Sequence, residues 1–226
     1  MNELWTTLLP LIIGSAVPPV HIIITILLLR ARAGRITAVA WLAGMTTVRL
    51  AQGVVFGLVL GIGGSEAGGS GGPGPILSTL LLVMAIVFFV AAAKQLLRLD
   101  DEDAPPPAWM ATVESMTLGR AFLAGAGILS IGVKFWIFTL GAIVAIEEAG
   151  LGQPGSTLAF LVFVVLAASI HLALIAVAYA MPARSEAFLG QVSGLLNRYN
   201  RPIMIVFEVV FGTWFLVKAL SGFGVL

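Results

Sequence analysis

The sequence predicts an all-α integral membrane protein with six transmembrane helices, arranged as two inverted three-helix repeats. Of its 226 residues 59% are hydrophobic and 10% are charged, and the mean hydropathy is +1.07, values outside the range of a soluble globular domain. A span needs about 20 apolar residues to cross the bilayer, so this length holds about six spans. The apolar runs lack the alternation of a membrane β-barrel, which leaves helices as the spanning elements.

The six predicted helices occupy residues 5–29, 36–62, 76–97, 118–146, 156–180 and 203–220. We expect the first to be retained, because no basic residue precedes it and its apolar run is longer than that of a signal peptide. All six belong to one membrane domain over residues 1–226. One repeat covers about 1–98, an acidic, proline-bearing cytoplasmic loop about 99–117, and the second repeat about 118–226.

Basic residues predict the orientation of these helices. Those near helix ends gather at the first, third and fifth connections: Arg30, Arg32, Arg35, Lys94, Arg98, Arg120, Arg184, Arg198 and Arg201. The N-terminus and the second and fourth connections carry none. Lys218 is the one basic residue near an outer end. Because basic residues next to spans stay on the cytoplasmic side, both termini are expected outside.

Two connections have a composition typical of unstructured chain. Residues 63–75 are rich in Gly, Ser and Pro, which predicts a flexible linker. Residues 100–107 hold four acidic residues and three prolines. We interpret them as a solvated, partly disordered tether, with contact to a cytoplasmic partner as the alternative.

The two halves share a pattern that favours an inverted repeat. At an offset of 113 residues several glycine and apolar positions coincide, and His21 falls on Lys134. Residues 17–21 and 130–134 both place helix disruptors beside a polar residue at mid-span. Interrupted helices in matching positions of two halves point to the central site of a transporter.

Pro18 and Pro19 are the first candidate site residues. Proline has no backbone N–H, so carbonyls about four positions earlier lose their helical partners inside the membrane. These carbonyls need water, a polar side chain or a ligand. Helical spacing places His21 on the face of Pro18, and it places Ser130 on the face of Lys134 in the fourth helix.

Arg49 and Lys134 lie near the bilayer midplane, about 20 to 24 Å from the inner helix ends. A charge at this depth costs about 3 kcal/mol or more, so it normally faces a bundle interior or a wet cavity. Gln52 lies one turn after Arg49 and could orient the guanidinium. Glu208 can neutralise one cation or exchange a proton, which leaves one cation without an acid. This imbalance predicts a site for an anionic substrate group.

The two histidines suggest a role in proton coupling, whereas the sequence does not support a metal site, a cofactor or an enzyme. His21 and His171 are either hydrogen-bonded packing residues or parts of a proton relay, and two histidines make a poor metal site. We expect no metal and no cofactor. The chain has no cysteine, no spacing typical of a nucleophile with its base, and no phosphate loop or basic nucleic-acid patch. Neither an enzyme nor a nucleic-acid partner is predicted.

The chain resembles the LysE superfamily of six-helix exporters. The resemblance rests on Gly-Ser-Ala-Val-Pro-Pro at residues 14–19, the basic loop at 30–35 and Gly-Val-Lys at 132–134. Amino-acid exporters of that superfamily usually show Pro-Gly-Pro and Asn-Pro-Lys at these places, and the departure weighs against an amino-acid substrate. Among its branches the chain looks most like the GAP family, also called sulfolipid-1-addressing (Sap) proteins.

The resemblance implies a role in moving lipids or glycolipids to the cell surface, beside a larger lipid exporter as one option. We therefore predict a multi-pass plasma-membrane exporter whose partners are membrane lipids and an anionic lipid or small-molecule substrate, with an oligomer as an open option. Arg49 and Lys134 would hold the substrate, and Glu208 and His171 would serve coupling or charge balance. The alternatives are an efflux carrier for amino acids or small polar solutes, and an accessory scaffold that moves nothing itself.

Overall fold

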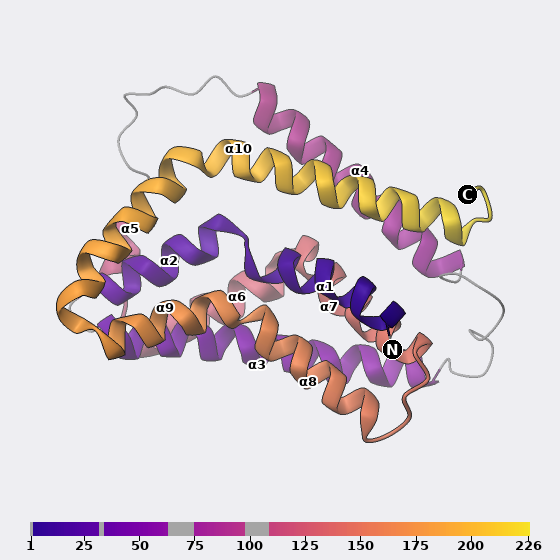
Figure 1. Cartoon of the computed structure of the whole chain (residues 1–226), viewed down its shortest axis with the longest axis horizontal. Coiled ribbons are helices and arrows are strands. Elements are labelled where there is room, and N and C mark those ends of the chain that lie inside the picture. The colour runs from indigo at the N-terminus through magenta and orange to yellow at the C-terminus, as the bar shows by residue number, and fades with distance from the viewer. Residues whose placement is uncertain (1, 32–33, 63–74, 98–108) are drawn as a thin grey trace. The chain divides into compact units, whose positions relative to one another are not determined.

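The computed structural model describes residues 2–31, 34–62, 75–97 and 109–226. Within these ranges the regular elements are all helices (Figure 1), which confirms the all-α prediction for the described part of the chain. The helices are α1 Asn2–Ala16, α2 Pro19–Arg30, α3 Gly34–Ile62, α4 Pro75–Leu97, α5 Trp109–Glu114, α6 Leu118–Ile131, α7 Val133–Glu148, α8 Gly155–Ala167, α9 Ser169–Ala180 and α10 Pro182–Gly222.

Several of these helices can cross a membrane. Three are long and apolar enough alone: α3 over Gly34–Leu58, α4 over Ser78–Leu97 and α10 within Ser185–Gly222. Three bent pairs, α1 with α2, α6 with α7 and α8 with α9, pass the same test as pairs, so the described residues hold three to six spans. The chain is therefore a multi-pass membrane protein.

Two of the bends lie where the sequence predicts interruptions. α1 and α2 meet at 50° beside Pro18 and Pro19, and α6 and α7 meet at 71° beside Gly132, whose φ of −74° and ψ of 79° are not helical. The third bend, 55° between α8 and α9 at Ala168, was not predicted, because neither proline nor glycine lies near it. There the Ala168 N–H is shared between two carbonyls, which tightens the turn.

The predicted start of the sixth helix at residue 203 is wrong. α10 begins much earlier and runs through the predicted fifth connection. Its first part buries residues four apart on one helix face, Ser185, Leu189 and Ser193. Pro202 lies inside α10. A short helix, α5, also occupies part of the predicted cytoplasmic loop, while residues 63–74 and 98–108, with the predicted linker and acidic tether, lie outside the described residues.

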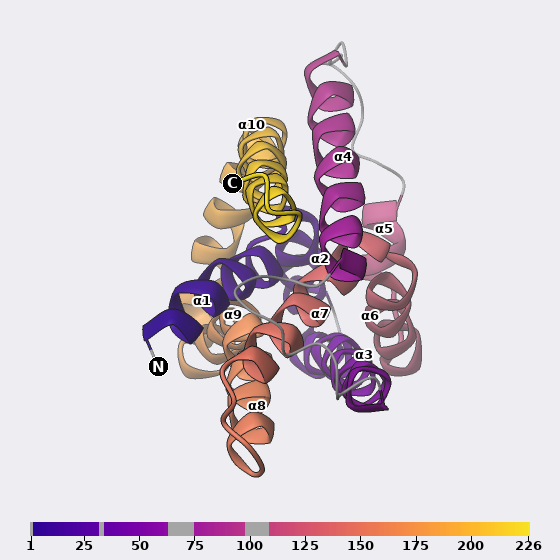
Figure 2. The ribbon, with the colours of Figure 1, turned by 90° about the vertical axis from the view of Figure 1, so that its right-hand side faces the viewer.

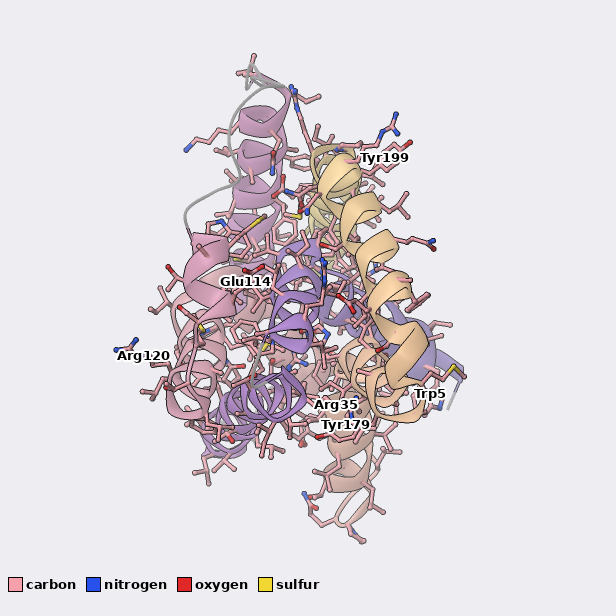
Figure 3. The ribbon with its side chains drawn as sticks, turned by 90° about the vertical axis from the view of Figure 1, so that its left-hand side faces the viewer. Trp5, Arg35, Glu114, Arg120, Tyr179 and Tyr199 are labelled. Carbon is pink, nitrogen blue, oxygen red and sulfur yellow. The ribbon has the colours of Figure 1, made fainter. Side chains whose placement is uncertain are left out.

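The chain divides into two compact units. Unit 1 consists of residues Met1–Val55 and Glu102–Tyr199. Within it α1 packs against α7 and α8, and α2 packs against α5 and α9 (Figures 1 and 2). At one end of this unit Arg35 lies beside Tyr179, with its guanidinium carbon 5.3 Å from the ring centroid (Figure 3). This cation–π contact ties the start of α3 to the end of α9.

Glycines bring α3 and α6 of unit 1 into close contact. A Cβ atom on Gly44 would collide with the backbone carbonyl oxygen of Phe122 in α6. A Cβ on Gly125 would likewise collide with the carbonyl oxygen of Trp41 in α3. Small residues allow helix backbones to approach this closely in membrane proteins. The contact holds the polar part of α3 against the helix that ends at the second predicted break.

Unit 2 consists of Phe56–Asp101 and Asn200–Leu226 and pairs α4 with the last part of α10. Its core is aromatic: the ring centroid of Phe88 lies 5.4 to 6.5 Å from those of Phe207, Phe211 and Phe215. Arg201 links α10 to α4, because its Nε and Nη2 donate to the carbonyls of Gln95 and Leu96 at 2.9 and 3.1 Å. These are carbonyls of the last turn of α4, which the helix itself leaves unpaired.

Candidate functional site

Arg49 lies in α3, in the interior of unit 1. It is 7% exposed, and its guanidinium carbon lies 5.8 Å from the ring centroid of Phe163 in α8. His171, in α9 of the same unit, is also buried, at 1% exposure. Its Nε has no hydrogen-bond partner among the described residues, and no described carboxylate of unit 1 pairs with the guanidinium. The aromatic ring stabilises the cation but does not supply the anionic acceptor that a buried arginine needs.

Gln52 lies one turn after Arg49 and faces the end of α6. It is 6% exposed, and its Nε2 donates to the carbonyl of Leu129 at 3.4 Å. Trp136 in α7 donates from its indole nitrogen to the same carbonyl at 2.9 Å and to that of Ser130 at 3.1 Å. Carbonyls at a helix end inside a membrane must find other donors. Here side chains from α3 and α7 supply them and hold the α6–α7 break in place.

Replacing Trp136 with Phe should therefore destabilise the break. The substitution keeps the aromatic ring and removes one donor from two backbone carbonyls, which should cost about 1–2 kcal/mol. We expect a lower thermal unfolding midpoint in detergent for Trp136→Phe than for Trp109→Phe, a control at a tryptophan 37% exposed in α5. Equal midpoints for the two variants would show that the indole hydrogen bonds do not support the break.

His21 connects the two predicted breaks. It lies in the first turn of α2 and is 3% exposed. Its ring centroid lies 4.6 Å from that of Phe135 in the first turn of α7, and 6.4 Å from that of Trp41 in α3. The Thr25 hydroxyl donates to the His21 carbonyl at 2.9 Å. The half-helices α2 and α7 thus begin next to each other inside unit 1.

Each of the three half-helices that follow a break has a basic residue in its first turn: His21 in α2, Lys134 in α7 and His171 in α9. Helix N-termini carry a partial positive charge from aligned peptide dipoles. The breaks therefore concentrate positive potential inside unit 1, where Arg49 also lies. Such an arrangement is suited to holding an anionic group in a half-buried or buried position.

The other predicted site residues are placed as follows. Pro18 and Pro19 are both buried at the first break. The Ser130 side chain is exposed. At the break its backbone carbonyl accepts a hydrogen bond from the Trp136 indole. Lys134 belongs to the first turn of α7, and its side chain lies outside what the structure describes. Glu208 is buried in unit 2 at 3% exposure. The structure thus gathers Arg49, Gln52 and both histidines in unit 1.

Sequence reasoning missed several participants in this site. Trp136 and Phe163 contact the predicted residues directly. Trp41, whose ring lies beside that of His21, is buried with an indole nitrogen that has no hydrogen-bond partner among the described residues. Trp136 lies just after the predicted interruption at residues 130–134, and this position in the sequence is a signal that could have pointed to it. Phe163 has none, because the residues around it in α8, from Leu158 to Ala167, are all apolar.

The sequence of this chain matches one protein family. The family described as Sap, sulfolipid-1-addressing protein, matches residues 8–221, nearly its whole length. The matched region contains every residue of the site described above. No curated protein and no solved structure matches the chain.

Proposed function

Because the chain belongs to the sulfolipid-1-addressing protein family, we propose that it is a plasma-membrane transporter that moves an anionic lipid or glycolipid toward the cell surface. The family supports a role in lipid addressing or transport. The observation that carries the proposal is Arg49, a buried guanidinium with no described carboxylate partner in its unit. A charge that is costly to bury marks a functional position in a membrane protein, and an anionic substrate group would supply the missing acceptor.

In this proposal the six spans form two inverted three-helix repeats with both termini outside, as in LysE-type exporters. Support comes from the positions of the breaks: α2 begins at Pro19 and α7 at Val133, within one residue of the 113-residue offset between the halves. Discontinuous helices at equivalent positions are how inverted-repeat transporters build a central site. Rocking of one repeat against the other would expose this site alternately to the two sides.

The substrate's anionic group would bind Arg49 and Lys134 beside the first turns of α2 and α7. The carbonyls that Pro18 and Pro19 leave without helical donors would remain available to polar groups of the substrate. Glu208 and His171 would serve charge balance or proton coupling. The apolar chains of a lipid substrate would stay in the bilayer, so only its head group needs this polar interior.

Transport can be tested with the purified protein in proteoliposomes of phosphatidylcholine. We expect fluorescent phosphatidylglycerol to cross these membranes at least about tenfold faster than fluorescent phosphatidylcholine, because charge-assisted hydrogen bonds discriminate by about that factor. Protein-free liposomes are the control, and a labelled amino-acid mixture is tested in parallel. Amino-acid movement alone would overturn the lipid substrate and favour an efflux carrier. Absence of all movement would overturn transport and favour an accessory scaffold for a larger lipid exporter.

A further inference from the structure

The amide of Gln52 has a determined orientation. Its neighbour, the carbonyl of Leu129, can only accept a hydrogen bond, so the NH₂ group of Gln52 must face it. The Gln52 Oε1 therefore faces another direction, where it is buried and has no hydrogen-bond partner among the described residues. A buried acceptor of this kind needs a donor from water or from a ligand.

Arg49 presents the opposite requirement one turn earlier on α3. A guanidinium has donors only, and the Arg49 Nε is buried without an acceptor among the described residues. Residues three apart on a helix are neighbours on one face. The interior of unit 1 thus places the Arg49 Nε, which needs an anionic acceptor, one helical turn from the Gln52 Oε1, which needs a donor.

We propose that Gln52 is a specificity-determining residue, which selects head groups carrying a hydroxyl next to their anionic group. The hydroxyl donates to Gln52 Oε1 while the anionic oxygens accept from Arg49. This inference rests on the proposed function and defines the head group it handles. An anionic head group without a hydroxyl satisfies only Arg49 and leaves the Gln52 oxygen unpaired, which lowers its affinity. The same chemistry occurs in a polyol phosphate lipid and in a free polyol phosphate.

Affinity for short-chain lipids tests the selection directly, with the full chain in detergent. Dioctanoyl phosphatidylinositol carries hydroxyls beside its phosphate, whereas dioctanoyl phosphatidylmethanol has the same charge and acyl chains without them. We expect the wild-type protein to bind the inositol lipid about five- to tenfold more tightly, the effect of one net hydrogen bond. Free inositol 1-phosphate should bind more weakly than its lipid, and equal affinity would overturn the lipid as the source of the head group.

Variants separate recognition by Gln52 from its contact with the α6 carbonyl. Gln52→Leu should reduce the preference for the inositol lipid over phosphatidylmethanol to about one, because neither head group then meets the Gln52 oxygen. Trp136→Phe is the matched control, because it removes the other donor to the Leu129 carbonyl and leaves the Gln52 oxygen intact. Because it destabilises the α6–α7 break it should weaken the binding of both lipids alike, so the ratio of their affinities should stay at the wild-type value.

Two outcomes would overturn the inference. Equal wild-type affinity for the two lipids would show that hydroxyls are not recognised, and loss of the preference in Trp136→Phe would assign the effect to the Leu129 carbonyl. Neither outcome depends on transport, because the assay measures binding. Anionic lipid movement without hydroxyl preference would overturn only the role of Gln52, whereas hydroxyl preference without movement would overturn only the proposed function.

Discussion

Replacing Arg49 with Gln is expected to reduce the movement of anionic lipid in proteoliposomes by about ten- to a hundredfold. The substitution removes the buried guanidinium, and hydrogen bonds to charged groups contribute about 1.5–3 kcal/mol. Arg49→Lys should retain part of the rate, because it keeps the charge but loses the planar fork that binds two oxygens at once. Initial rates for labelled phosphatidylglycerol measure both effects.

Arg198 provides the matched control for this prediction. It is an exposed arginine of unit 1 whose guanidinium carbon lies 5.7 Å from the ring centroid of its neighbour Tyr199. Arg198→Gln removes the same charge outside the proposed site and should leave transport unchanged. If the double variant Arg49→Gln, Lys134→Ala folds correctly and still moves anionic lipid at the wild-type rate, the cationic site is wrong.

Replacing Gly125 with Ala is expected to have the largest effect on stability, a loss of at least about 2 kcal/mol. The new methyl group would collide with the backbone carbonyl of Trp41, and a backbone atom cannot move aside as a flexible side chain can. α3 and α6 would have to separate, with loss of their packing. The thermal unfolding midpoint and the monodispersity of the protein in detergent measure this loss.

Gly127→Ala is the control on the same helix. A Cβ on Gly127 meets no atom within 4 Å, so alanine adds helix propensity there without a clash. This variant should be as stable as the wild type or slightly more stable. Equal midpoints for the alanine variants of Gly125 and Gly127 would contradict the close contact of α3 and α6. Gly44→Ala should not add fully to Gly125→Ala, because both act on one interface.

The sequence by itself determined the features that depend on composition and on local backbone chemistry. The high hydrophobic content predicts membrane helices because lipid leaves no other way to pair the backbone. Pro18 and Pro19 predict the first break, because their missing N–H groups remove backbone hydrogen bonds from the helix turn in which they lie. The spacing of Arg49 and Gln52 places them on one face wherever α3 packs.

Only the tertiary structure decided which helix faces meet. Phe163 and His171 lie more than 100 residues from Arg49 in sequence, and apolar residues occupy most positions of their helices. In lipid no amphipathic pattern separates a buried face from an outer one, because the bilayer is as apolar as the protein interior. The bend at Ala168 and the two side-chain donors to the Leu129 carbonyl likewise depend on packing between distant segments. For this reason the partners of the predicted site could not be read from spacing.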